Sequence, residues 1–286
     1  MRYEVPESLD AAVEILAGEA GSARVLAGGT DLLVQLRAGM IDPDLMVDVK
    51  KIPGLGAISV ENGGFRIGAV VSGAVLGEHG EVAKLWPGVV EAAELIGSTQ
   101  IQGRASMGGN LCNASPAADS VPALIASGAT VSIIGPGGRR EAAAEDIAIG
   151  PGQTSLAKGE IVVSIFLPSR PAHSGDAYLR FIPRTEMDIA VVGAGVSLTL
   201  DDAGICTDAR VALGAVAARA LLVGEAADAL IGTSVDDAAL ANLAAAASAA
   251  CKPIDDKRGT KEFRIKVAGV MTRRAAETAL ARARTN

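Results

Sequence analysis

The segment that most constrains how this chain can fold is residues 25–32, VLAGGTDL. It joins an apolar run over residues 24–27 to two glycines and then to an apolar-spaced segment over residues 31–40, which predicts a strand, a tight turn and a helix. Glycine lets the backbone approach a bulky anion, and Thr30 is a candidate N-cap that would aim the helix N-terminus at that anion. The segment therefore predicts either a phosphate-binding loop or a structural turn.

A second glycine-rich segment lies at residues 100–113, QIQGRASMGGNLCN, and begins no long helix or strand. Its centre, SMGGN, again places two glycines beside small polar side chains. Two such loops could enclose a diphosphate from both sides, with Arg24 and Arg104 either offsetting its charge or lying solvated. The chain has no GxxxxGKS/T loop and no GxGxxG between a strand and a helix. The sequence therefore indicates neither a P-loop nor an ordinary dinucleotide fold.

The composition of the chain argues against several locations, partners and kinds of site. Hydrophobic residues make up 49% of the 286 residues without a run of eighteen, and the beginning, MRYEVPESLD, is unlike a signal peptide. We therefore expect a soluble, cytoplasmic protein without a membrane span. A net charge of −7 with few aromatics argues against nucleic acid as a partner. Three scattered cysteines and two histidines are too few for a disulfide framework, a metal cluster or a well-supported Ser-His-Asp triad.

Hydrophobic periodicity predicts the order of the elements. In the first part we expect strands over residues 24–27, 45–49, 57–60, 65–71, 129–134 and 161–167. Helices are expected over residues 8–17, 31–40 and 120–127, with helical segments up to residue 96 that are interrupted at Pro87. After a boundary at residues 168–175 we expect three strands, over residues 178–182, 189–200 and 205–214. Three helices, over residues 218–231, 236–250 and 260–284, are expected to follow.

The last of these helices carries an excess of positive charge. Residues 252–286 hold ten Lys and Arg against four Asp and Glu. Phe263, Val267, Val270 and Met271 recur at helical spacing, which predicts an apolar stripe against a sheet with the basic side chains facing outward. A solvated helix face and a docking surface for an acidic neighbour both account for this charge.

Four blocks of the sequence resemble, in order and spacing, the FAD-binding subunit of molybdenum hydroxylases. That family includes the medium subunit of carbon monoxide dehydrogenase and the flavin domain of xanthine dehydrogenase. The blocks are VLAGGTDL at 25–32, SMGGNLCNASPAAD at 106–119, RTEMDIAVVGAGVSL at 184–198 and DDKRGTKEFRIKVAGVMTRRA at 255–275. The resemblance spans nearly the whole chain.

The resemblance implies an α+β fold in two domains. Residues 1–170 would form a two-part FAD-binding domain of the vanillyl alcohol oxidase type, also called PCMH-type, with subdomains at about residues 1–55 and 56–170. Residues 176–286 would form a C-terminal flavoprotein domain built from a three-stranded sheet with helices.

The resemblance also implies which residues bind FAD. Two loops would clamp its diphosphate, and their residues here are Leu26, Ala27, Gly28, Gly29, Thr30, Asp31, Leu32, Ser106, Gly108, Gly109 and Asn110. Asp119 is expected along the nucleotide half of FAD, as a cap of the following helix, or as both. Where many relatives carry a Lys near the flavin ring, this chain has Arg180, which either keeps that charge or is an ordinary strand residue. Asp188 is expected to order the sheet.

The implied function is that of an oxidoreductase flavoprotein subunit which is inactive on substrate alone and has no catalytic or metal-binding residues. FAD, held non-covalently, would take electrons from 2Fe-2S clusters of a small partner subunit and pass them to an external acceptor. Substrate would be oxidised at the molybdenum cofactor of a large partner subunit, in a hetero-oligomer such as a dimer of heterotrimers. Two alternatives stay open: a stand-alone flavin reductase of related fold, and a non-catalytic protein whose loops hold AMP or ATP. The substrate and the final acceptor leave no signature in this chain.

Overall fold

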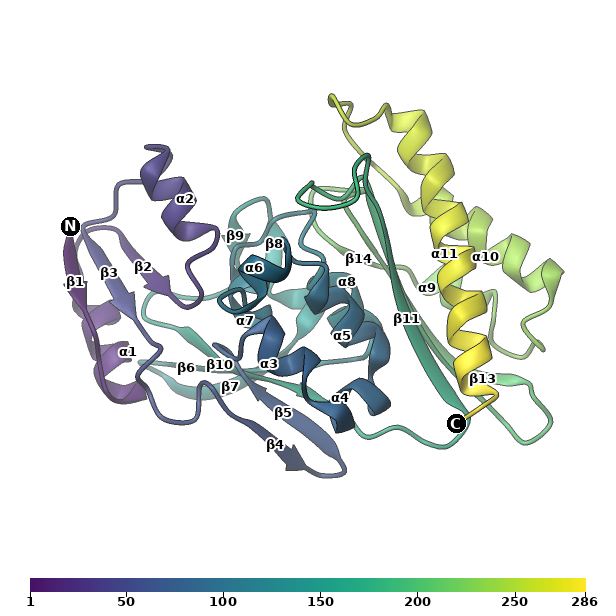
Figure 1. Cartoon of the computed structure of the whole chain (residues 1–286), viewed down its shortest axis with the longest axis horizontal. Helices are drawn as coiled ribbons and strands as arrows, with labels where there is room; N and C mark the ends of the chain where they lie inside the picture. The colour runs from purple at the N-terminus through teal and green to yellow at the C-terminus, as the bar shows by residue number, and fades with distance from the viewer.

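The structure is a computed structural model that describes residues 1–286. It is an α+β fold with a small N-terminal sheet at one end, a central sheet with a group of short helices, and a C-terminal sheet covered by long helices at the other end (Figure 1). None of the helices combines the length and the apolar character needed to cross a bilayer.

The N-terminal sheet is parallel and has the order β1-β3-β2. Its strands are β1 (Arg2–Glu4), β2 (Ala23–Leu26) and β3 (Leu45–Asp48). Helix α1 (Leu9–Gly18) follows β1 and is capped by Ser8, whose hydroxyl accepts from the Ala11 N–H at 3.2 Å. Helix α2 (Leu32–Arg37) follows β2 and buries none of its residues. Strand β1 was not predicted, because three residues carry too little hydrophobic pattern.

The central sheet is antiparallel with the order β4-β5-β10-β6-β7. Its strands are β4 (Ile58–Glu61), β5 (Gly64–Gly68), β6 (Thr130–Gly135), β7 (Gly138–Ala143) and β10 (Ile161–Leu167). The 3₁₀ helix η1 (Ala144–Asp146) and the small hairpin of β8 (Ala148–Gly150) and β9 (Gln153–Thr154) lie between β7 and β10. The turn at residues 135–138 joins β6 to β7, and β7 was not predicted because its residues are mostly polar or small.

Six short helices connect β5 to β6. They are α3 (Gly73–Gly77), α4 (Gly80–Leu85), α5 (Pro87–Glu94), α6 (Thr99–Gln102), α7 (Met107–Cys112) and α8 (Ser120–Ala126). The predicted interruption at Pro87 is confirmed, since α5 begins there. Every residue of α8 is buried, and this helix packs against the strands of the C-terminal sheet and against α5 and α7.

The C-terminal sheet is antiparallel with the order β11-β12-β13-β14. Its strands are β11 (Ser174–Phe181), β12 (Val192–Leu200), β13 (Cys206–Gly214) and β14 (Leu221–Leu222). Helices α9 (Gly224–Asp228), α10 (Asp237–Ala250) and α11 (Lys261–Ala283) follow. The sheet therefore has four strands rather than three. The predicted helix over residues 218–231 is wrong in its first part, because Leu221 and Leu222 pair with β13 at the sheet edge, and is confirmed only at α9.

The stripe expected on α11 is wrong in part. Phe263 and Val270 are 41% and 43% exposed, and the buried face consists mainly of alanines. These small side chains let the helix backbone approach the sheet, and a Cβ on Gly175 of β11 would lie 2.0 Å from the Ala279 carbonyl oxygen. Nor do all basic side chains face outward. Arg264 is 3% exposed, donates to the Val191 carbonyl at 2.8 Å and pairs with Asp256 at 2.7 Å.

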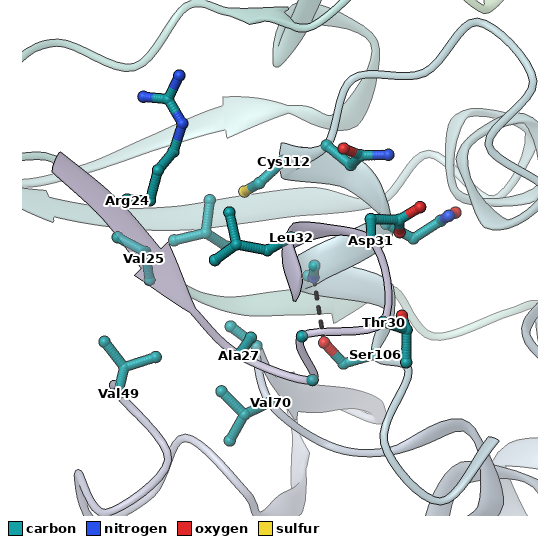
Figure 2. Close-up of a pocket in the computed structure, with 18 of the residues that line it drawn as sticks. Arg24, Val25, Ala27, Thr30, Asp31, Leu32, Val49, Val70, Ser106 and Cys112 are labelled. Atoms are coloured by element: carbon teal, nitrogen blue, oxygen red, sulfur yellow. Dashed lines mark hydrogen bonds between the residues drawn. The ribbon is translucent and has the colours of Figure 1, made fainter. Parts of the chain in front are cut away.

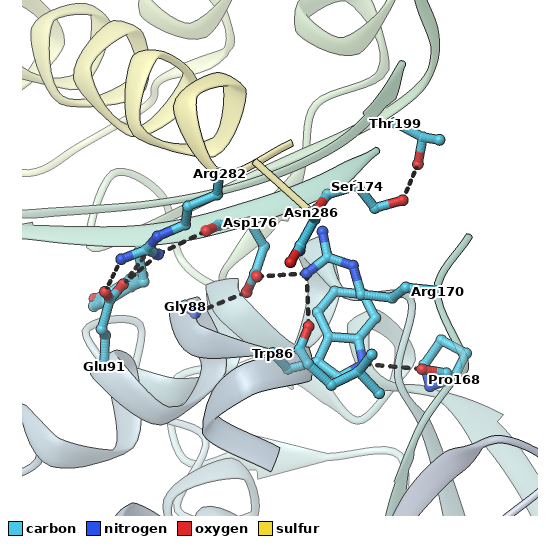
Figure 3. A network of polar contacts seen from close by, with 12 residues as sticks. Trp86, Gly88, Glu91, Pro168, Arg170, Ser174, Asp176, Thr199, Arg282 and Asn286 are labelled. Atoms are coloured by element: carbon cyan, nitrogen blue, oxygen red, sulfur yellow. Dashed lines mark hydrogen bonds and ion pairs between the residues drawn. The ribbon is translucent and has the colours of Figure 1, made fainter. Parts of the chain in front are cut away.

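A polar network joins the helices of the central part to the C-terminal part (Figure 3). Arg170 pairs with Asp176 at 2.6 Å, and both side chains are almost fully buried. The Arg170 guanidinium also lies over the Trp86 ring, 4.2 Å from its centroid. Asp176 accepts from the Gly88 N–H at 2.9 Å, in the first turn of α5. Arg282 of α11 pairs with Glu91 of α5.

Candidate functional site

The two glycine-rich segments line one pocket of about 570 Å³, a size typical of cofactor pockets (Figure 2). The first segment reaches it from the end of β2 and the second from the start of α7. The predicted residues that line it are Ala27, Gly28, Gly29, Thr30, Asp31, Leu32, Ser106, Gly108, Gly109 and Asn110. Segments almost eighty positions apart in the sequence thus meet in a single site.

Three predicted residues do not line this pocket. Leu26, the last residue of β2, is buried with 7% of its surface exposed. Asp119 and Arg180 pair with each other at 2.9 Å. Asp119 precedes α8 but makes no side-chain capping bond, because its carboxylate is occupied by Arg180 and by the Tyr178 hydroxyl at 2.9 Å.

The glycines of the two loops are needed for close packing. A Cβ on Gly28 would lie 1.9 Å from the Arg104 carbonyl oxygen, and one on Gly108 would lie 2.4 Å from the Ala69 carbonyl oxygen. Gly29 adopts φ +79°, a conformation that residues with a side chain rarely take. Gly109 differs, since a Cβ there would contact only the Ser106 hydroxyl, at 3.1 Å, and the Ala27 side chain, at 3.9 Å.

Both loops present backbone N–H groups that have no acceptor within the chain. The N–H groups of residues 28–31 donate to no protein atom, and the same holds for Met107 and Gly108 at the start of α7. Successive free N–H groups along a glycine-rich loop favour an anion. The prediction that Thr30 caps the helix is wrong, since α2 begins at Leu32 without a side-chain cap. Because the N–H groups of residues 28–31 have no acceptor in the chain, this loop is suited to binding a phosphate group.

Side-chain hydrogen bonds hold the second loop in shape. Ser106 caps α7 by accepting from the Gly109 N–H at 3.1 Å. Asn110 Oδ1 accepts from the N–H and the hydroxyl of Ser120, at 3.2 and 2.7 Å, so its Nδ2 is the group left to bond a ligand. Gln35 of α2 donates to Asn113 Oδ1 at 3.0 Å and so joins the first loop to the second across the pocket.

The rest of the pocket is largely apolar. Figure 2 shows Val25, Leu32, Val49 and Val70 around the cavity, with Arg24 at its edge. Several of these residues were not predicted, because an apolar strand residue has the same pattern whether it faces a core or a ligand. Arg104, the other flanking arginine, does not line the pocket.

No histidine lines the pocket, and its one cysteine is Cys112. Burial raises the pKa of this thiol to about 12, so it stays protonated and is a poor nucleophile. No group of three or more His, Cys, Asp or Glu side chains is placed to hold a metal ion. The carboxylates that line the pocket are Asp31, whose pKa burial raises, and Glu160, which pairs with Arg140 at 2.6 Å.

Asp188 lies away from this pocket and fastens two loops together. Its carboxylate accepts from the Ile189 N–H at 2.8 Å and from Arg258 at 2.7 Å, and these bonds hold its pKa below the usual value. The loop after β11 is thereby tied to the segment before α11. Arg258, like Arg264 and Arg282, is paired with an acidic group, so much of the basic excess of the tail is neutralised within the chain.

Comparison with known proteins agrees with this geometry. Residues 1–170 match the family model of the FAD binding domain in molybdopterin dehydrogenase, and residues 177–279 match the CO dehydrogenase flavoprotein C-terminal domain. The carbon monoxide dehydrogenase medium chain of Afipia carboxidovorans is 36% identical over 99% of this chain and 97% of its own length. The xanthine dehydrogenase FAD-binding subunit of Escherichia coli is 30% identical over 98% of this chain and 96% of its own length.

A solved structure has the same fold along its whole length. One chain of reconstituted CO dehydrogenase from Oligotropha carboxidovorans superposes with a TM-score of 0.94 and 35% identity, covering 99% of this chain and 98% of that chain. This chain therefore belongs to the family of FAD-binding medium subunits of the molybdenum hydroxylases.

Proposed function

We propose that this chain is the FAD-binding, electron-transferring subunit of a molybdenum-dependent dehydrogenase or hydroxylase. The observation that carries the proposal is the meeting of the two glycine-rich loops at one pocket, with free backbone N–H groups on both. Relatives named as FAD-binding or medium subunits of carbon monoxide and xanthine dehydrogenases, aligned over nearly the full chain, support it.

The residues of the pocket fit FAD. The N–H groups of residues 28–31 and the start of α7 would bind the diphosphate, with Asn110 Nδ2 as a further donor. Val25, Val49 and Val70 would pack against a ring of the cofactor. Because Cys112 stays protonated and no histidine is present, the chain would hold FAD without a covalent bond.

When bound, FAD supplies the redox chemistry, since it can exchange electrons with one-electron and two-electron partners. The chain binds and orients this cofactor, shields it from water and stabilises charge with backbone dipoles. It would be inactive on substrate alone, because the molybdenum cofactor would lie in a large partner subunit and 2Fe-2S clusters in a small one. We expect a hetero-oligomer such as a dimer of heterotrimers.

We further propose that residues 1–170 form a two-part domain of the vanillyl alcohol oxidase type, divided near residue 55, and that residues 176–286 form the C-terminal domain. The N-terminal sheet packs in a small apolar core that also includes Ile134 and Ile161 of the central sheet, while two larger cores fill the central and C-terminal parts. Asp119 and Arg180 do not line the pocket, and we place them in the layer of residues around the proposed FAD site. The cytoplasmic location stays a prediction.

Selective removal of FAD from the purified complex tests this function. In the FAD-free complex, substrate should still reduce the iron-sulfur clusters, seen by electron paramagnetic resonance, whereas reduction of an external dye should be lost. Added FAD should restore dye reduction. Dye reduction that persists without FAD would contradict the electron-transfer role.

The two alternatives predict different behaviour of the chain by itself. A stand-alone flavin reductase would oxidise NADPH without partner subunits. A non-catalytic nucleotide-binding protein would bind AMP or ATP in preference to FAD. Either result would displace the proposed function.

A further inference from the structure

Arg180 is buried where the C-terminal sheet meets the wall of the pocket. Its side chain on β11 is 5% exposed, and Nη1 donates to Asp119 Oδ2 at 2.9 Å and to the Leu95 carbonyl oxygen at 2.8 Å. Leu95 is the C-cap of α5, and the last carbonyl groups of a helix have no partner within the helix. The guanidinium therefore fixes the point at which the chain leaves α5.

The two ends of the segment that leaves α5 line the pocket. Ile96 and Ala105 both line the cavity. At the far end of the segment, the Arg104 carbonyl packs directly against Gly28 of the first loop. Residues 96–105 are thus held at one end by Arg180 and at the other by the glycine loop.

Asp119 and Arg180 depend on each other. Burial raises the pKa of the Asp119 carboxyl, while the charge of Arg180 and the bonds from Tyr178 and Arg180 oppose that rise. Removing either partner leaves a buried group without its partner, which is costly. Both hydrogen bonds from Arg180 Nη1 go to protein atoms, the Asp119 carboxylate and the Leu95 carbonyl oxygen.

We propose that Arg180 is a positioning residue of the FAD site, which acts through Asp119 and Leu95 on the segment at residues 96–105 rather than by touching bound flavin. This inference rests on the proposed function, because the ligand in question is FAD. It assigns β11 of the C-terminal part a role in setting the shape of a pocket that belongs to the N-terminal part. Because the Arg180 guanidinium is paired with Asp119, its contribution is to hold the shape of the pocket rather than to place a charge beside the flavin.

The test uses the complex purified with its partner subunits. Arg180→Met and Asp119→Asn should each raise the rate of FAD dissociation about tenfold, and the double variant should raise it no further. Both should alter the visible circular dichroism of the bound flavin in the same way. Arg180→Lys, whose ammonium can donate to both oxygens, should restore most of the slow dissociation.

Arg210 supplies a matched control. From β13 it donates to the Ile125 carbonyl at 2.9 Å, near the end of α8, and pairs with Glu145 at 2.8 Å. This is the same kind of contact, but neither Ile125 nor Glu145 lines the pocket. Arg210→Met should therefore leave FAD dissociation within about twofold of the wild-type rate.

The outcomes separate this inference from the proposed function. A wild-type complex without FAD overturns both. If the wild type holds FAD and Arg180→Met behaves like Arg210→Met, only the positioning role is lost. Additive effects of Arg180→Met and Asp119→Asn also overturn it. So does a shift in the flavin reduction potential that occurs in Arg180→Met and not in Asp119→Asn, because that result would show direct contact.

Discussion

Gly28 packs so closely against Arg104 that a Cβ on the glycine would lie 1.9 Å from the arginine carbonyl oxygen. This contact joins the first glycine loop to the backbone that leads into the second. The pocket therefore depends on the absence of a side chain at one position in each loop, at Gly28 and at Gly108.

Gly28→Ala should weaken both the fold and FAD binding. The added methyl group must displace the Arg104 backbone, and such overpacking costs about 1–3 kcal/mol. Urea unfolding and the FAD content of the purified complex measure the two effects. Gly103→Ala is the matched control, because a Cβ there meets nothing within 4 Å. Equal stability and FAD content in the two variants would contradict the packing argument.

The hydrogen bond between Gln35 and Asn113 should slow the loss of FAD. Helix α2 buries no residue, and Leu33 and Val34 are 48% and 63% exposed, so few other contacts hold it over the pocket. Gln35→Ala should speed FAD dissociation about three- to tenfold, since one hydrogen bond contributes about 0.5–1.5 kcal/mol.

Asn113→Ala and the double variant complete the cycle for this bond. The double variant should match either single variant, because all three lack the same interaction. The melting temperature should change little. Additive rates would show that the two side chains act separately.

The buried pair of Arg170 and Asp176 should contribute strongly to stability. Arg170→Met leaves Asp176 buried with the Gly88 N–H and without its charge partner, and breaking such a pair costs about 3–5 kcal/mol. Chemical denaturation measures the loss. Arg273→Met removes an exposed pair with Asp237 and should change stability little. A small effect of Arg170→Met would show that water reaches Asp176.

Asp176 should also make stability depend on pH. Burial raises its pKa from 3.8 to about 6, although Arg170 opposes the rise. Between these values the folded chain holds a proton that the unfolded chain releases, so this contribution to the free energy of unfolding falls as pH rises and is constant above both. The free energy of unfolding of the wild type minus that of Asp176→Asn should therefore fall from about pH 4 to about pH 6.5. A rise in this value over the same range would mean that the ion pair outweighs burial.

The sequence predicted the loops and strands better than the surroundings of the site. The pair Gly28-Gly29 and the pair Gly108-Gly109 were visible, because glycine beside a strand or a helix start has a local signature. Strands β12 and β13 were predicted as well, because each is a mostly apolar run bounded by turn residues. Strand β14 was not, since Leu221 and Leu222 are strand only through pairing with β13, which overrides an alanine-rich helical pattern.

Long-range contacts account for the other differences. The burial of Arg264 and the exposure of Phe263 depend on how α11 lies on the sheet, which its own periodicity does not fix. Likewise, the partners of Arg180 are Asp119 and Leu95, 61 and 85 positions away. Local sequence indicates a charge at position 180 but not what neutralises it.

The most direct test of the account is the flavin absorption of the purified complex containing Gly109→Asp, compared with Gly109→Asn and wild type. In both variants the new Cβ would lie 3.1 Å from the Ser106 hydroxyl oxygen, but only Asp adds a negative charge where the diphosphate is expected. We predict flavin bands at about 370 and 450 nm in the wild type, strongly reduced in Gly109→Asp and largely kept in Gly109→Asn. Full flavin bands in Gly109→Asp, or a folded wild-type complex without them, would contradict the two-loop FAD site.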